Sequence, residues 1–173
     1  MTGEDVRRLV LVRHATAAAT APSDHARTLT SQGRADAAEA GRWLHDRGVR
    51  PDAALVSDAT RAVQTWEQVA AGAGWSCPAA HSAGLYAAGA DSAFDLLRDT
   101  DAGVGCLVVV GHNPTMATLA ELVDDGEGDA DATTSMLTRG FPPAALAVFS
   151  VAVPWSGLGP GTGRLEAFHV GAG

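Results

Sequence analysis

The chain has 173 residues, of which 46% are hydrophobic and 18% are charged, and its formal net charge is −8. This length fits one domain with its own hydrophobic core, and the composition excludes an intrinsically disordered chain. The acidic charge argues against nonspecific nucleic-acid binding, which needs a basic surface, whereas a small phosphorylated substrate needs only a few convergent arginines.

The cysteines and the N-terminal residues indicate no metal, disulfide or membrane segment. Cys77 and Cys106 lack the CxxC spacing of metal sites and are interpreted as reduced, partly buried thiols. No cofactor is expected. The N-terminus, MTGEDVRRLV, is unlike a signal peptide, and no apolar run approaches membrane-spanning length. The sequence therefore predicts a cytoplasmic protein with no membrane partner.

Apolar runs alternate with helix-like segments over the first two thirds of the chain. LVLV (9–12) is short and continuously apolar, as expected of a strand buried on both faces. Thr30 is the expected N-cap of the first helix, and Gly48 ends it. In chain order, the patterns predict strands at 9–12, 53–57, 76–80 and 106–110, and helices at 30–48, 59–74, 91–100 and 113–123.

The pattern changes after residue 123. An acidic, glycine-bearing loop is predicted at 124–131, and strands at 144–153 and 164–170 flank the loop PWSGLGPGTG as a hairpin. Strand–helix alternation followed by a hairpin predicts an α/β fold, with a mostly parallel sheet and helices on both of its faces. One domain is expected over residues 1–173, with its core at about 9–153 and the hairpin strand at 164–170.

Two of the predicted buried strands lead into a histidine. LVLV runs into Arg13 and His14, and CLVVV is followed after one glycine by His112. Ligands of open α/β sheets bind beyond the carboxyl ends of strands, so the two histidines meet if these strands are neighbours. Asn113 and Pro114 predict an N-cap and a first-turn proline, which would place His112 where a helix N-terminus favours an anion.

A third element is expected at the same edge of the sheet. Arg61 lies in the first turn of the helix that follows the second strand. Together with Arg13, it can grip a tetrahedral dianion through two guanidinium groups. One imidazole can attack phosphorus in its neutral form, while the other, protonated, donates a hydrogen bond as charge develops. The residues predict a phosphate pocket but leave open which histidine is the nucleophile.

Four blocks, LVRHA, RTLTSQG, VSDATRAVQT and VVGHNP, resemble in order and spacing the histidine phosphatase superfamily, which has the phosphoglycerate-mutase-like fold. The small size and the DHARTLTSQG block look most like its SixA-type phosphohistidine phosphatase branch. The resemblance covers residues 9 to about 149. It implies that His14 is the nucleophile that becomes a phosphohistidine, and that Arg13, Arg61 and His112 complete the pocket.

The chain departs from the larger superfamily members at the proton donor. Those members carry a Glu or Asp in an insertion after the third strand, and the corresponding segment here, GLYAAGADS (84–92), is short. Asp91 is expected to cap a helix rather than to donate a proton. Asp24 and Arg27 either border the pocket or lie in a solvated loop. Because imidazole leaves more easily than an alkoxide, the absence of a clear acid favours N–P bonds or activated esters.

The sequence therefore predicts a metal-independent phosphatase that acts through phospho-His14 on a protein phosphohistidine or another activated phosphate. Two alternatives remain. A general small-molecule phosphomonoesterase of the same fold is favoured if Asp91 or Asp24 donates a proton. A noncatalytic phosphate- or phosphoprotein-binding module is favoured if the pocket is blocked.

Overall fold

The computed structural model describes residues 6–171, which form one six-stranded sheet with helices on both faces. The strands are β1 (Arg7–Arg13), β2 (Ala53–Ser57), β3 (Ala79–Ser82), β4 (Cys106–Gly111), β5 (Leu146–Val151) and β6 (Gly163–His169). The helices are α1 (Ser31–Asp46), α2 (Thr60–Ala73), α3 (Ala83–Tyr86), α4 (Ala90–Arg98), α5 (Thr115–Val123) and α6 (Ala130–Arg139), with a 3-10 helix, η1 (Trp155–Gly157).

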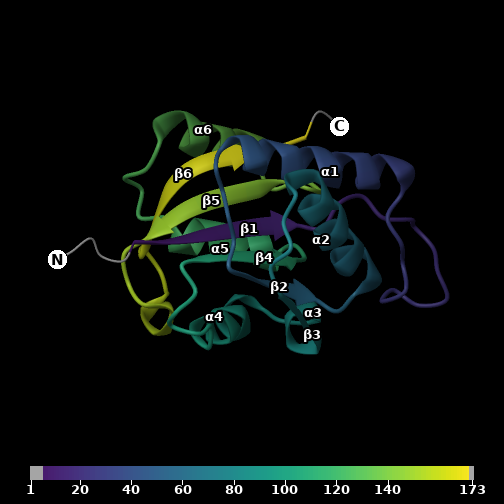
Figure 1. Cartoon of the computed structure of the whole chain (residues 1–173), viewed down its shortest axis with the longest axis horizontal. Coiled ribbons are helices and arrows are strands. Elements are labelled where there is room, and N and C mark those ends of the chain that lie inside the picture. The colour runs from purple at the N-terminus through teal and green to yellow at the C-terminus, as the bar shows by residue number, and fades with distance from the viewer. Residues whose placement is uncertain (1–5, 172–173) are drawn as a thin grey trace.

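The strands follow the order β3-β2-β4-β1-β5-β6, with β1 and β4 in the middle of the sheet (Figure 1). The pairings among β1 to β4 are parallel, whereas β5 runs antiparallel to both β1 and β6. The predicted fold class, a mostly parallel α/β sheet that ends in a hairpin, is confirmed. Within the described residues, no helix is both long and apolar enough to cross a membrane.

The central pairing of β1 with β4 determines where the predicted site residues emerge. The parallel register aligns Arg13 with Gly111, so His14 and His112 follow paired positions. The backbone N–H of His14 also donates to the carbonyl of Gly111 at 3.0 Å. The prediction that the two histidine-bearing strands are neighbours is therefore confirmed.

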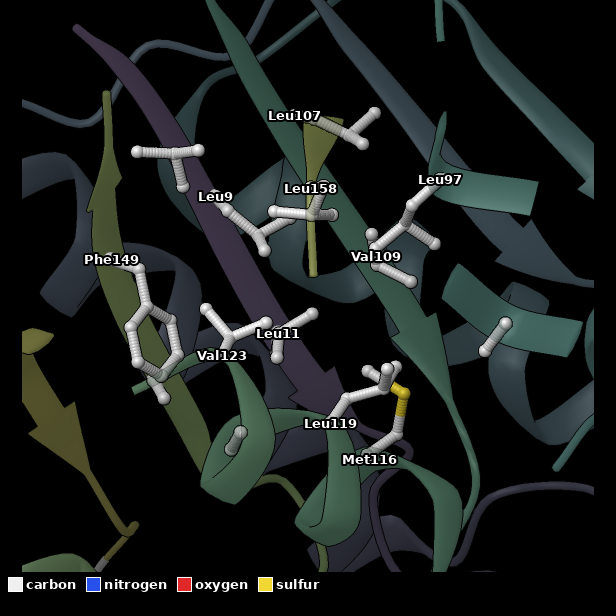
Figure 2. Packing of buried hydrophobic residues seen from close by; sticks show 14 of the residues in the cluster. Leu9, Leu11, Leu97, Leu107, Val109, Met116, Leu119, Val123, Phe149 and Leu158 are labelled. Atoms are coloured by element: carbon white, nitrogen blue, oxygen red, sulfur yellow. The ribbon is translucent and has the colours of Figure 1, made fainter. Parts of the chain in front are cut away.

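Strand β1 is apolar throughout its centre because both of its faces are covered. Leu9 and Leu11 pack into the layer that contains α4 and α5, whereas Val10 and Val12 pack against α1 and α2, and all four are fully buried. Figure 2 shows side chains of β1, β4 and α5 that meet in the first layer, among them Leu9, Leu11, Leu107, Val109, Met116, Leu119 and Val123. This packing holds the sheet edge in place from both sides.

Helix α6 is the main element that the sequence did not predict, because the acidic loop was expected to extend into it. Asp129 caps the helix, and its carboxylate accepts the N–H of Ala132 at 2.8 Å. Of the helix side chains, just Ala132 and Met136 are buried, so its sequence carries little apolar periodicity. The one-turn helix α3 also went unpredicted.

Two predicted helix caps are wrong in detail. Helix α5 begins at Thr115 after a cis Asn113–Pro114 peptide, and Pro114, not Asn113, occupies the N-cap position. The Asn113 side chain still accepts the N–H of Ala117 at 3.2 Å. Asp91 is not the cap of α4, because Gly89 holds that position and Asp91 lies inside the first turn, where its charge complements the helix dipole.

Helices α1 and α2 pack in close contact through glycines. A Cβ atom at Gly41 would lie 2.1 Å from the carbonyl oxygen of Val69, and one at Gly72 would lie 2.2 Å from that of Ala38. Both collisions are with backbone, which cannot rotate away as a side chain can. The two helices therefore approach as closely as they do because these positions lack side chains.

We expect Gly41→Ala to lower the free energy of unfolding by about 2 kcal/mol, measured by urea denaturation. A collision with backbone lies in the upper part of the overpacking range and outweighs the gain of about 1 kcal/mol in helix propensity. Gly89→Ala is the matched control, because its added Cβ would meet nothing within 4 Å. An unchanged denaturation midpoint for Gly41→Ala would contradict the close-packing argument.

Candidate active site

His14 follows β1, and a single backbone contact determines its tautomer. Its Nδ1 lies 2.8 Å from the carbonyl oxygen of Ala15. Because a carbonyl oxygen only accepts hydrogen bonds, Nδ1 must carry the proton. In the neutral ring, Nε2 is then left with a free lone pair. Of the two nitrogens, Nε2 is therefore the one prepared to act as a nucleophile.

His112 follows β4 and is oriented by Ser57 at the end of β2. Its Nε2 lies 2.7 Å from Ser57 Oγ, which also accepts the N–H of Ala59 at 3.2 Å. We infer that the Ser57 hydroxyl donates to Nε2, which places the proton of a neutral His112 on Nδ1. That Nδ1 is buried and has no hydrogen-bond partner within the described chain.

The two imidazoles are close together and share an electropositive environment. Their ring centroids are 5.1 Å apart. Burial, aided by the neighbouring histidine and arginines, lowers the pKa of His14 to about 4. Burial, followed by the charge of Arg61, lowers the pKa of His112 to about 4 as well. Both rings are therefore neutral at pH 7 without a bound anion, and His112 is not the imidazolium that the sequence analysis expected there.

Arg61 projects from the first turn of α2 and is buried, with 6% of its surface exposed. Its Nη1 donates to the backbone carbonyl of Asp24 at 2.8 Å, and its Nη2 to the Asp24 carboxylate at 3.0 Å. Its Nε is buried without a partner among the described residues. The backbone is tied in as well, because Thr65 Oγ1 donates to the Arg61 carbonyl and accepts the N–H of Ala15.

Arg13 ends β1 and is positioned by the loop between α6 and β5. Its Nη1 donates to the carbonyl oxygen of Phe141 at 3.2 Å, and the Asn113 amide donates to the same oxygen at 2.8 Å. The Nε of Arg13 is buried and lacks a partner in residues 6–171. Phe141 was not singled out in the sequence, because it contributes a backbone carbonyl that any residue could supply.

The structure places Asp24 and Arg27 in the loop of residues 19–27, here called the rim loop. Ala17 pairs with Leu29 at its base, and Arg27 Nε donates to the Ala18 carbonyl at 2.7 Å. The Asp24 carboxylate accepts from Arg27 at 3.1 Å as well as from Arg61. Of the two open hypotheses for Asp24, this contact favours the pocket border over a purely solvated loop.

Tyr86, at the end of α3, is a second group at the pocket that the sequence analysis missed. Its hydroxyl donates to the Asp24 carboxylate at 2.6 Å. Hydrogen bonds from Tyr86, Arg27 and Arg61, in that order of strength, hold the pKa of Asp24 well below its ordinary value. Asp24 is therefore ionised at neutral pH and has no proton to give.

His25 and Asp58 form a further pair outside the predicted set. His25 Nε2 lies 2.9 Å from Asp58 Oδ1. The Tyr86 ring makes edge contacts with both His25, at 5.0 Å between centroids, and His112, at 5.5 Å. His25 was assigned no role from the sequence, because nothing in the spacing of the histidines indicated that it reaches this edge of the sheet.

Taken together, these residues form a cationic pocket whose buried donors lack an acceptor. Three such nitrogens belong to predicted site residues: Arg13 Nε, Arg61 Nε and His112 Nδ1. A buried donor without an acceptor is costly, so the cluster is prepared for a ligand that carries several acceptor oxygens. No group of three or more His, Cys, Asp or Glu residues that could hold a metal ion is found in the described part of the chain.

The pocket can now be compared with known proteins. A family profile described as histidine phosphatase superfamily (branch 1) matches residues 9–86. The candidate phosphohistidine phosphatase SixA from Nakamurella multipartitia is 31% identical with a TM-score of 0.83, over 97% of this chain and 98% of that one. The protein histidine phosphatase SixA, solved with tungstate, is 26% identical with a TM-score of 0.74, over 93% and 95%.

A curated relative extends the comparison at the level of sequence. An uncharacterized protein of Mycobacterium tuberculosis is 35% identical over 148 residues, which amount to 86% of this chain and 91% of that protein. The chain thus matches these relatives over nearly their whole length.

Histidine NMR can test the electrostatics of the free pocket. We expect His14 and His112 to titrate at about pH 4. Inorganic phosphate should raise the pKa of His112, because the dianion offsets the two guanidinium charges. Since both folded pKa values lie below the unfolded value of about 6.5, stability should fall as pH drops from about 6.5 to about 4. Titration of either ring near pH 6.5 in the free protein would contradict the assignment.

Proposed function

The chain belongs to the histidine phosphatase superfamily and is a phosphatase, and on that premise we propose that it hydrolyses phosphohistidine through a covalent phospho-His14 intermediate. The observation that carries the proposal is the set of three buried, unpartnered donors around a neutral histidine. A phosphoryl group has the charge and the oxygens to satisfy all three donors.

His14 is the proposed nucleophile. Its Nε2 lone pair is available because Nδ1–H donates to the Ala15 carbonyl, and its lowered pKa keeps the ring neutral over the physiological range. Attack on phosphorus leaves the phosphorylated ring with a positive charge. The Ala15 carbonyl then stabilises that charge through the same hydrogen bond.

Arg13, Arg61 and His112 are the proposed ligands of the transferred phosphoryl group. Charge on its equatorial oxygens is stabilised by donors that are already oriented, and this is the main work of catalysis in phosphoryl transfer. His112 can contribute its Nδ1–H while neutral, because Ser57 satisfies Nε2. It need not enter the reaction as an imidazolium.

The leaving group is the feature that favours phosphohistidine over a sugar phosphate. Expulsion of an alkoxide needs a general acid, whereas imidazole leaves as a neutral ring. Asp24 contacts the pocket directly but is held ionised by its three donors. Asp91 lies in the first turn of α4, and no contact joins it to the pocket residues within the described chain. A protein phosphohistidine, or a similarly activated phosphate, suits this pocket best.

The first test compares a phosphohistidine-bearing protein, an aryl phosphate and an alkyl phosphate. We expect turnover of the first two, little of the third, and a loss of at least about 1,000-fold in His14→Ala, because the nucleophile is removed. Rapid quenching should trap a phosphoenzyme that is acid-labile and absent from His14→Ala. His45→Gln is the control, since His45 is exposed at the far end of α1.

The same assay distinguishes the neighbouring hypotheses. Alkyl phosphates turned over as well as phosphohistidine would favour the general phosphomonoesterase and would require an acid that serves alkoxides. A chain that binds phosphate without any turnover would contradict the proposal.

We expect Asp24→Asn to lower kcat by about 10-fold, because Arg61 loses a charged partner and is held less firmly for the transition state. KM should stay the same or fall, since the substitution removes a negative charge beside an anion pocket. Asp95→Asn breaks the exposed Asp95–Arg98 ion pair on α4 and is the matched control. An increase in KM at constant kcat would show instead that Asp24 serves mainly ground-state binding.

A further inference from the structure

We propose that His25, held by Asp58, donates a proton to the substrate's phosphohistidine ring at the nitrogen that does not carry phosphorus, here called the far nitrogen. The inference rests on the proposed function, because it assigns a residue to the leaving group of that reaction. It identifies a proton donor that is an imidazole and not a carboxylic acid.

The first observation is the position of His25 relative to the pocket. His25 belongs to the rim loop, and its carbonyl accepts the N–H of Thr60 at the start of α2. Its ring contacts Tyr86, which in turn contacts His112, so His25 lies one aromatic ring further out than His112. Its side chain is 44% exposed. His25 is therefore a titratable group at the mouth of the pocket.

The second observation is the hydrogen bonding of His25. Asp58 Oδ1 is a carboxylate oxygen, so the 2.9 Å contact requires a proton on His25 Nε2. No protein group among the described residues hydrogen-bonds to Nδ1. The carboxylate stabilises the imidazolium form, in which Nδ1 carries a second proton. His25 thus has one nitrogen anchored and one free to donate.

The chemistry of the leaving group explains why a donor at this distance is useful. A phosphohistidine whose far nitrogen is unprotonated would have to leave as an imidazolate anion, which is a very poor leaving group. Protonation of the far nitrogen allows departure as neutral imidazole. That nitrogen lies across the ring from phosphorus, so its donor must be further from the phosphoryl site than a donor to an ester oxygen would be.

The proposed step balances as follows. The proton passes from His25 Nδ1 to the far nitrogen, the substrate N–P bond breaks, and its electron pair returns to the departing neutral imidazole. The lone pair of His14 Nε2 forms the new N–P bond. In the second half-reaction, a water molecule gives a proton to the neutral His25 as its oxygen attacks phosphorus. The His14–phosphorus bond then breaks, which restores both histidines and releases phosphate.

The test uses two substrates that differ in one methyl group. Phosphoimidazole needs a proton at its far nitrogen, whereas phosphorylated N-methylimidazole carries a methyl group there and leaves as a neutral ring without one. We expect His25→Gln to lower kcat/KM for phosphoimidazole by about 100-fold, the usual contribution of a general acid. For the methylated substrate, kcat/KM should be unchanged, which also shows that the variant is folded. Asp58→Asn should give a smaller loss with the same selectivity.

Every other outcome overturns the inference. Equal losses on both substrates would mean that His25 acts by holding the rim loop, and no loss on either would mean that it takes no part. The control is again His45→Gln. A wild-type chain that turns over neither substrate through His14 would remove the proposed function, whereas His14-dependent turnover that is insensitive to His25→Gln removes this inference alone.

Discussion

The parallel pairing of β1 with β4 is the constraint on which the site depends. It brings two strands that are distant in sequence to one edge, with His14 and His112 as the next residues along each. Full burial on both faces fixes the register, since a slip by one residue would exchange the two packed layers. The 5.1 Å between the imidazoles is thus maintained by the core and not by contacts within the pocket.

Around this pair, the protein collects positive charge against the trend of its composition. The chain is acidic overall, yet two buried guanidinium groups face the imidazoles, and each arginine has one nitrogen without an acceptor. The same charge and burial that await an anion also keep both histidines unprotonated. Anion recognition and nucleophile activation therefore share one physical origin.

The sequence predicted the elements and residues whose side-chain pattern reports their environment. Continuous apolar runs marked the central strands, and the histidines after them marked the edge. Ser57, Tyr86 and Phe141 escaped because their roles depend on contacts across the fold: a hydroxyl under His112, a phenol on Asp24 and a backbone carbonyl for Arg13. Helix α6 escaped because it buries too few apolar side chains to leave a periodic pattern.

The contact between Asp24 and Arg61 has a consequence for turnover. An anion pocket with no counter-charge would bind inorganic phosphate as firmly as substrate and would be slow to empty. Asp24 already takes both terminal nitrogens of Arg61, so an arriving phosphate shares that cation with a permanent carboxylate. The pocket is thereby limited in how tightly it can retain its product, and the exposed side of Asp24 leaves water free to compete for the departing oxyanion.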